Sequence, residues 1–347
     1  MSFRMMIGLI AIAVAVTLFP LFVKKVGDNL EFFFFVMGIA AVTVASQWRV
    51  SLLLDALRGP LEITLAVFLA SLLFHFIQDR LEREIARLRA QIGPKLLVCA
   101  IIALTGLLSS FLTAIIASVV MVETVSRLKM DRKTETRVVV LACFSIGLGS
   151  ALTPFGGPLA AVAVAKLAGA PYHAGTWFLL RHLWSYVIPG IALVSVASVF
   201  HLNGHDAPKS PVPREERETF ASTIIRTLKV YVFVAGLILL GAGFTPLIES
   251  FIGSIPYWAL FWANITSAVL DNAMLTAAEI VPSMQMSQIV AALMGCLIAG
   301  GMLVPGNIPN IIAASRLKIG NLEWAKIAVP FGIAMMIVMF VILIVQR

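Results

Sequence analysis

One aspartate and one asparagine lie side by side inside an otherwise apolar stretch of the chain. Residues 266–276 read Thr-Ser-Ala-Val-Leu-Asp-Asn-Ala-Met-Leu-Thr, which places Asp271 next to Asn272. Between residues 252 and 283 the only other acid is Glu279, and there is no lysine or arginine. A charge at membrane depth costs about 2.5–3.5 kcal/mol on insertion scales, so an acid in such a stretch indicates a function.

The residue types around Asp271 suit the binding of a small cation. Hard cations prefer oxygen ligands, and Asp271, Asn272 and Ser267 offer a carboxylate, an amide and a hydroxyl oxygen. A carboxylate can also take up a proton, and one group that binds either a cation or a proton is a minimal exchanger. We therefore expect Asp271 to couple two ions. The alternative is a structural cap, in which the carboxylate accepts hydrogen bonds from free N–H groups of a half-helix.

The composition indicates an all-α polytopic membrane protein. Of the 347 residues, 60% are apolar and 13% are charged, about half the charged share of a soluble protein. Apolar stretches of about 20 residues recur along the chain, as membrane-spanning helices require. The net charge of +8 does not indicate nucleic acid, because the basic residues lie in short loops where they set the topology.

Apolar stretches and loop charges predict the elements that must position Asp271. Uninterrupted spans are expected at about 5–23, 29–47, 59–78, 174–200, 230–247 and 325–345, and a charged stretch at 79–92 predicts an amphipathic helix in the membrane interface. Two further apolar segments, 138–168 and 286–318, contain prolines and glycines that break a helix. With these two broken helices, about eight full spans are expected.

Two other apolar segments are expected to be re-entrant hairpins. Residues 95–126 have basic clusters at both ends, which places both ends in the cytoplasm. Residues 255–283 have no basic residue at either end, which places both ends outside. Non-helical backbone at this depth must be surrounded by protein or by a water-filled cavity.

The two halves of the chain share one plan. A shift of 151 residues places Gly149 on Gly300 and Pro154 on Pro305, and a shift of 158 places Thr113 on Asp271. We expect an N-terminal pair of helices at 1–58, a first repeat at 59–200, a cytoplasmic linker at 201–225 and a second, inverted repeat at 226–347. Inverted repeats with interrupted helices are typical of transporters with a site near the bilayer midplane.

At these residues the chain resembles the ion transporter superfamily, which includes arsenite pumps, NhaD-type sodium/proton antiporters and sodium-coupled divalent anion symporters. Residues 267–272 resemble the hairpin-tip motif of the antiporter and arsenite branches, and Gly-Asn-Ile-Pro-Asn at 306–310 resembles the Gly-Asn-rich break of the facing helix. The resemblance covers about residues 60–347, and it is strongest to an uncharacterised family of predicted cation transporters.

The resemblance implies that an ion binds between hairpin tips and helix breaks. The implied residues are Ser267, Asp271 and Asn272 at the second tip, Gly306, Asn307 and Asn310 in the facing break, Ser109 and Thr113 at the first tip, and Thr153, Gly156 and Gly157 in its facing break. Sodium would bind at Ser267, Asp271 and Asn272, with no other cofactor. Ala114 departs from the family pattern, because members often carry asparagine there.

The expected function is secondary transport of a small cation, most simply sodium/proton antiport. The alternative is an anion or oxyanion carrier of the same fold, because half-helix N-termini can hold anions. An intramembrane enzyme is not expected, since Asp271 has no second intramembrane aspartate and no His-Glu-x-x-His motif occurs. The expected partners are a small inorganic ion, membrane lipid and, from the resemblance, a second copy in a homodimer of a prokaryotic inner membrane.

Other polar residues of the apolar segments have simpler interpretations. Glu123 and Glu279 are expected to face an interface or to pair with a base. Cys99, Cys143 and Cys296 lie far apart in apolar runs and show no metal or redox spacing.

Overall fold

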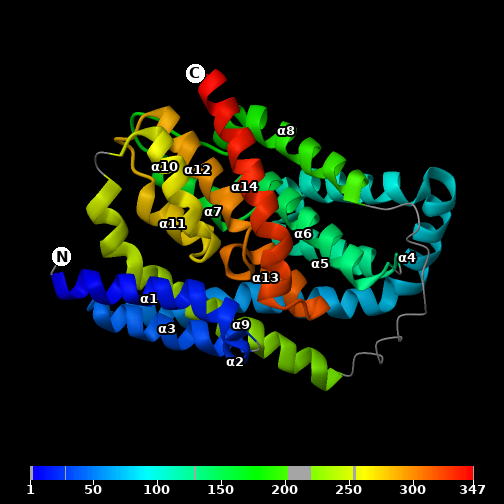
Figure 1. The fold of residues 1–347 in the computed structure, drawn as a ribbon, viewed down its shortest axis with the longest axis horizontal. Helices are drawn as coiled ribbons and strands as arrows, with labels where there is room; N and C mark the ends of the chain where they lie inside the picture. The colour runs from blue at the N-terminus through cyan, green and yellow to red at the C-terminus, as the bar shows by residue number, and fades with distance from the viewer. Residues whose placement is uncertain (1–2, 28, 129, 202–219, 253–254, 347) are drawn as a thin grey trace.

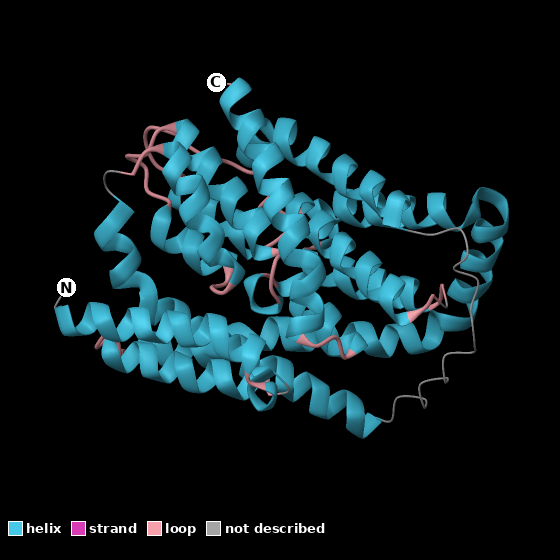
Figure 2. Ribbon diagram, in the orientation of Figure 1, coloured by secondary structure: helices cyan, strands magenta, loops and turns pink. Residues whose placement is uncertain are grey.

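The chain folds entirely into helices in the part that the structure describes. This computed structural model describes residues 3–27, 29–128, 130–201, 220–252 and 255–346, and all regular secondary structure within them is helical (Figure 2). The all-α prediction is therefore confirmed. Most of the linker expected at 201–225 lies outside the described residues, because residues 202–219 are not among them.

In the described part of the chain, four helices are long and apolar enough to cross a membrane. They are α1 (Phe3–Phe22), the end of α4 (Val50–Leu112), α8 (Phe178–His201) and α14 (Asn321–Val345). Shorter apolar helical stretches occur in α3 (Leu30–Val44), α5 (Ala114–Ser126), α9 (Phe220–Ile252) and α12 (Met286–Gly300). Helices of this length and composition indicate a membrane protein.

The N-terminal helices form a layer against α9. Helix α1 is followed by the single turn α2 (Lys24–Gly27), and α1 and α3 lie beside α9 in Figure 1. A Cβ at Gly38 would lie 2.6 Å from the backbone oxygen of Gly236, so glycine at this position allows α3 and α9 to approach closely. Small residues at such crossings are typical of helix packing in membranes.

Helix α4 is longer than the sequence predicts. Its backbone runs from Val50 to Leu112 with one non-helical residue, Gly93, at φ 77°. The span expected at 59–78, the interfacial helix at 79–92 and the first arm of the hairpin therefore follow one another in one helical run that is kinked at Gly93. Glycine accepts a positive φ without steric cost, and the following Pro94 disfavours a helical conformation for the residue before it. The side chains of residues 66–90 lie outside the described part.

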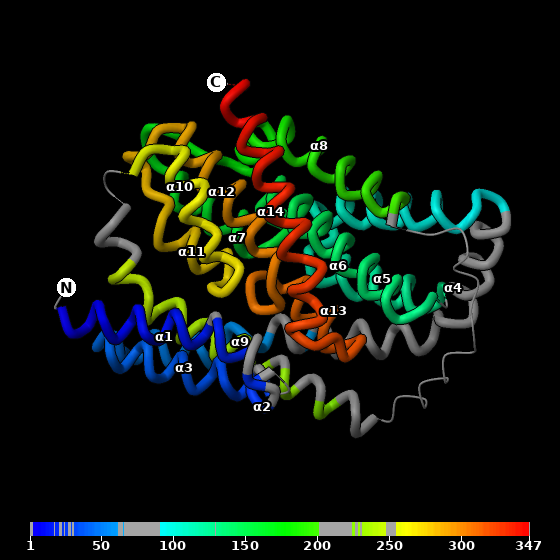
Figure 3. Tube along the Cα trace, in the orientation of Figure 1, coloured from blue at the N-terminus to red at the C-terminus, as the bar shows by residue number. Residues whose placement is uncertain are grey.

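Two helices are interrupted in the middle of the fold. Helix α6 (Arg132–Gly149) resumes as α7 (Pro158–Lys166), and α12 resumes through a short turn, η2 (Val304–Gly306), as α13 (Ile308–Leu317). Helix α10 (Tyr257–Ala263) and the turn η1 (Asn264–Ala268) precede α11 (Asn272–Glu279). Figure 3 traces the chain through both interruptions. Backbone N–H and C=O groups at these interruptions lack helical partners, so they are available to form a site.

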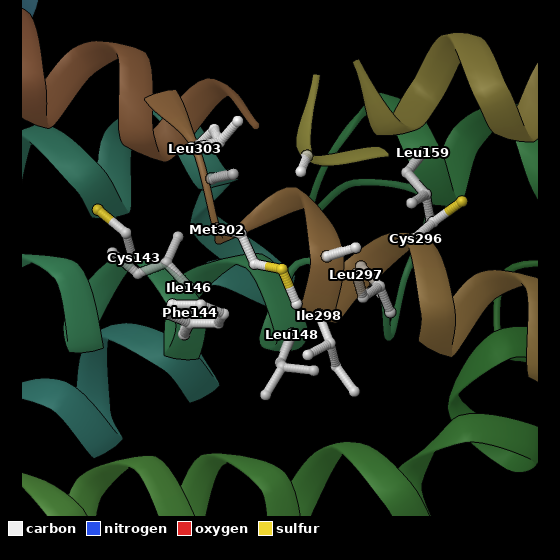
Figure 4. Close-up of a cluster of buried hydrophobic side chains, with 14 of the residues drawn as sticks. Cys143, Phe144, Ile146, Leu148, Leu159, Cys296, Leu297, Ile298, Met302 and Leu303 are labelled. Atoms are coloured by element: carbon white, nitrogen blue, oxygen red, sulfur yellow. The ribbon is translucent and has the colours of Figure 1, made fainter. Parts of the chain in front are cut away.

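The core of the molecule lies where α6 meets α12. Both helices are almost entirely buried, and Figure 4 shows their apolar side chains in one cluster, with Phe144 of α6, Leu297 of α12 and Met302 of the break after α12 among them. The breaks that follow α6 and α12 therefore begin in the buried core.

Candidate functional site

Asp271 caps the half-helix α11. Its Oδ1 accepts hydrogen bonds from the backbone N–H groups of Ala273 at 3.0 Å and Met274 at 3.2 Å. Among the described residues, its second oxygen Oδ2 forms no hydrogen bond, and the side chain is only half-buried. The capping alternative is thus what the structure shows for one oxygen, while the other oxygen is available to a ligand.

Three of the expected site residues converge on Gly300, the last residue of α12. A Cβ at this glycine would lie 3.0 Å from the backbone oxygen of Gly306 and 3.5 Å from both Asn272 Nδ2 and Ser267 Oγ. Ser267 also donates to the backbone oxygen of Cys296 at 3.1 Å. The second hairpin tip and the second helix break therefore meet at this point, and polar atoms from both surround it.

Asn310 adds an unused oxygen to this cluster. The side chain is completely buried, and its Nδ2 donates to the backbone oxygens of Gly300 and Leu303, each at 2.8 Å. Its Oδ1 is buried and has no hydrogen-bond partner among the described residues. Such an atom in a native interior calls for an explanation, and a bound ion or water is one of the usual ones.

Asn307 faces the first half of the chain. A Cβ at Gly147 of α6 would lie 2.6 Å from Asn307 Nδ2, so glycine makes room for this amide. The thiol of Cys143, one turn earlier in α6, donates to the backbone oxygen of Pro309 at 3.5 Å. The second break therefore packs directly against α6.

The first hairpin tip is tied to the first break. Thr113 has φ 69° and caps α5, because its Oγ1 accepts from the N–H of Ile116 at 3.3 Å. The N–H of Ala114 donates to the backbone oxygen of Gly156 at 2.6 Å, and the hydroxyl of Thr153 donates to a backbone oxygen of the tip. The structure thus brings Thr113, Thr153 and Gly156 together.

Ser109 and Gly157 also lie where the first hairpin tip meets the first break, and few side-chain oxygens there are free to bind a ligand. Ser109 donates to the backbone oxygens of Gly106 at 2.6 Å and Ile146 at 3.1 Å. A Cβ at Gly157 would lie 3.5 Å from the hydroxyl of Ser150. This site is built from backbone groups and hydroxyls, without the carboxylate and amides of the second site.

The sequence did not reveal the partner of Glu279. Asn264 Nδ2 donates to Glu279 Oε2 at 2.9 Å and to the backbone oxygen of Ala292 at 3.1 Å, and both side chains are buried. Of the two expected alternatives, Glu279 shows the first, because it faces the interface of α11 with η1 and α12 and bonds to an amide there. Glu123 shows the second, because it pairs with a base, Arg316 of α13. The sequence did contain one signal of the pair of Glu279 and Asn264, because Asn264 is a polar amide between the apolar α10 and the second hairpin tip.

A transition-metal centre has no support in this part of the chain. In the described residues, no group of three or more histidine, cysteine or acidic side chains could hold a metal ion. The three cysteines are free thiols. The oxygen atoms near Gly300 and Asp271 are the ligands that a small hard cation prefers.

The arrangement defines a class of protein: an all-helical membrane protein in which interrupted helices meet at a buried polar cluster. The family model described as "Protein of unknown function (DUF1646)" matches residues 6–346, so the chain belongs to this family. No curated protein matches the chain.

Proposed function

We propose that this protein is a secondary transporter for a small cation, which it exchanges for protons, and that sodium is the cation. The supporting observation is the polar cluster around Gly300, where the buried Oδ1 of Asn310 accepts no hydrogen bond from the described residues. A cation bound there would be coordinated by Asn310 Oδ1 together with oxygens of Ser267 and of the interrupted backbone. No other cofactor is required.

Asp271 is the proposed coupling residue. Its Oδ1 holds the start of α11 while Oδ2 is unused among the described residues, so capping and ion binding do not exclude each other. Binding or release of a cation at Oδ2 would act on the same residue that caps the start of α11. Cation binding and the position of α11 are therefore linked through one side chain.

Equivalent residues at the two tips support an internal repeat. The shift of 158 residues pairs Thr113 with Asp271, and each caps the half-helix that follows. The shift of 151 residues pairs Gly149 with Gly300, and each ends the first half of an interrupted helix. A Cβ at Gly149 would lie 2.8 Å from Ser109 Oγ, as one at Gly300 would lie near Ser267 Oγ.

Helix packing supports the inversion of this repeat. Helix α4 contacts α6 in the first half and α10 contacts α12 in the second, while α5 contacts α13 and α11 contacts α7 across the halves. In each hairpin, one arm thus packs on the interrupted helix of its own half, and the other arm contacts the interrupted helices of both halves. This arrangement fits two re-entrant hairpins related by a two-fold axis, as in transporters with inverted repeats.

The alternative, an anion or oxyanion carrier, fits the tips less well. Anions bind half-helix N-termini through free backbone N–H groups. At the second tip, Asp271 already accepts from Ala273 and Met274, and at the first tip Gly156 accepts from Ala114. These donors are used, and a carboxylate beside them repels an anion, so the geometry favours a cation.

We place the transporter in a prokaryotic inner membrane as a homodimer, with the ion and the surrounding lipid as its other partners. Apolar side chains of α1 and α3, such as Ile7, Phe32 and Val36, are exposed in the single chain. Lipid or a second copy would cover such a surface in a membrane.

Dye-loaded proteoliposomes test the proposal. A pH gradient is imposed, and sodium, lithium, potassium or calcium is added in turn. We expect one cation to dissipate the gradient with the wild type and not with Asp271→Asn, which keeps a capping oxygen but loses the charge. The matched control is Asp131→Asn, because Asp131 caps α6 in the same way, through Lys133 and Thr134, away from the site.

The outcomes separate the two candidate functions. Unchanged exchange by Asp271→Asn would refute its coupling role. No response to any cation would refute cation transport, and arsenite and small carboxylates would then be added to test the anion alternative.

A further inference from the structure

A second buried acid lies behind the tip of the same hairpin. Asn264 opens η1 and Glu279 ends α11, and the two side chains are 0% and 5% exposed. The amide nitrogen of Asn264 lies between two acceptors, Glu279 Oε2 at 2.9 Å and the backbone oxygen of Ala292 at 3.1 Å. The pair therefore joins both arms of the hairpin to α12.

One atom of this pair has no partner. The Oδ1 of Asn264 is buried and accepts no hydrogen bond from the described residues. Within the same part of the chain, no basic side chain forms an ion pair with Glu279, whereas the similarly buried Glu123 pairs with Arg316. A buried carboxylate without a cation is costly unless it is neutralised, so both members of the pair lack something that a ligand would supply.

Among the described side chains of the helices around α11, no charged group neutralises Glu279. Helices α7, α9 and α12 pack against α11. On α12 the titratable group near Glu279 is the buried thiol of Cys296. On α7, Lys166 is exposed, and on α9, Lys229 pairs with Glu31 while Tyr231 donates to a backbone oxygen of α4.

The hydrogen-bond pattern favours a proton over a metal ion as the missing ligand. A metal ion between Glu279 Oε2 and the backbone oxygen of Ala292 would meet an N–H donor, because Asn264 Nδ2 already lies there. A carboxylic acid pairs with a primary amide through two bonds, N–H to C=O and O–H to amide oxygen. The first bond is present, and the O–H of protonated Glu279 would supply the hydrogen that Asn264 Oδ1 lacks.

We propose that Glu279 and Asn264 form a proton-binding site, separate from the cation site at Asp271. The two acids are eight positions apart in the sequence, which corresponds to about 12 Å along α11. A proton from the aqueous phase binds the carboxylate oxygen and leaves as the same proton, so no other reactant is involved. This assignment rests on the proposed cation/proton exchange: Asp271 holds the cation, Glu279 carries the proton, and Asn264 positions Glu279.

Protonation of Glu279 is tested on the purified wild-type protein without any transport. A hydrophobic carbodiimide reacts with protonated carboxyl groups, and mass spectrometry locates the modified residue. We expect modification of Glu279 that is lost as the pH rises, and none of the matched control Glu123, which is buried in an ion pair. Absence of modification at Glu279 across the pH range would overturn the proposal.

Variants in proteoliposomes test the coupling. We expect Glu279→Gln to keep the protection against heat that the cation gives, because the site at Asp271 is intact, and to lose cation-driven proton movement. Asp271→Asn is expected to lose the protection by cation and to keep the pH-dependent modification of Glu279. Wild-type proton movement in Glu279→Gln would overturn the proposal. If Glu279→Gln does not fold, the wild-type modification decides.

The two proposals fail in different ways. Modification of Glu279 without any cation exchange would leave the proton site standing and refute the transporter function. Cation exchange without modification of Glu279, and with normal exchange by Glu279→Gln, would refute the proton site and leave the transporter function standing.

Discussion

Replacing Gly300 with alanine would put one methyl group into the middle of the candidate cation site. The new Cβ would lie 3.0 Å from the backbone oxygen of Gly306 and 3.5 Å from Asn272 Nδ2 and Ser267 Oγ. The last two distances are ordinary van der Waals contacts, and the first requires the break to move by a few tenths of an ångström. The methyl group thus takes space among the polar atoms while leaving the fold largely in place.

Two opposing effects set the stability of Gly300→Ala. Alanine in a helix is favoured over glycine by about 0.5–1 kcal/mol, and overpacking a tight interior costs about 1–3 kcal/mol. We therefore expect the cation-free protein to lose at most about 2.5 kcal/mol, the largest cost minus the smallest gain. A bound cation at 100 times its dissociation constant stabilises the wild type by about 2.7 kcal/mol, and Gly300→Ala should lose this gain.

The matched control is Gly190→Ala in α8. Its Cβ would lie 3.1–3.3 Å from Leu148 Cδ1, Met339 Cε and Met335 Cε, which are all ends of flexible side chains. The crowding is similar, but no candidate ligand is involved. Thermal unfolding of both variants in detergent, with and without the cation, measures the difference. A wild-type cation shift in Gly300→Ala would refute our placement of the site.

Two further predictions concern groups outside the proposed sites. Glu123→Ala removes the carboxylate buried beside Arg316 and should lower the free energy of unfolding by about 3–5 kcal/mol. Glu323→Ala breaks an ion pair with Arg132 in which the side chains of Arg132 and Glu323 are 48% and 38% exposed, so it should lower this free energy by at most about 1 kcal/mol. Chemical unfolding of both variants measures the difference. Hydrogen bonds from the Thr134 side chain and backbone lower the pKa of Asp131, so its contribution to stability is present above its usual pKa and lost as the pH falls through the lowered value. The difference in unfolding midpoint between wild type and Asp131→Asn should therefore shrink in acid.

Most helices of this fold can be predicted from apolar runs and from proline and glycine. The stretch expected at 29–47 is helical at Leu30–Val44, and the break expected within 138–168 lies between Gly149 and Pro158. The run through residues 79–92 was expected to be a separate interfacial helix. Its residues are good helix formers without proline or glycine before Gly93, so the helix continues. Helix length alone does not tell where a membrane ends.

The candidate site was predictable where polar side chains interrupt apolar stretches. Asp271 and Asn272 were recognisable because polar residues are expensive in an apolar stretch. The role of Gly300 was not, because glycine carries no side chain that signals a contact. The pair of Asn264 and Glu279 depends on how η1 folds back onto α11 and α12, which is a tertiary arrangement that local sequence does not specify.

The comparison of the two hairpin tips shows why the charge of Asp271 needs a functional explanation. Thr113 stands at the equivalent position and caps α5 with a neutral hydroxyl. Capping a half-helix in this fold therefore does not require a carboxylate. The second half also carries Asn272, Asn307 and Asn310 where the first has alanine, glycine and leucine under the same shifts. Because each polar group is costly at this depth, their concentration in one half supports our proposal that the cation binds there.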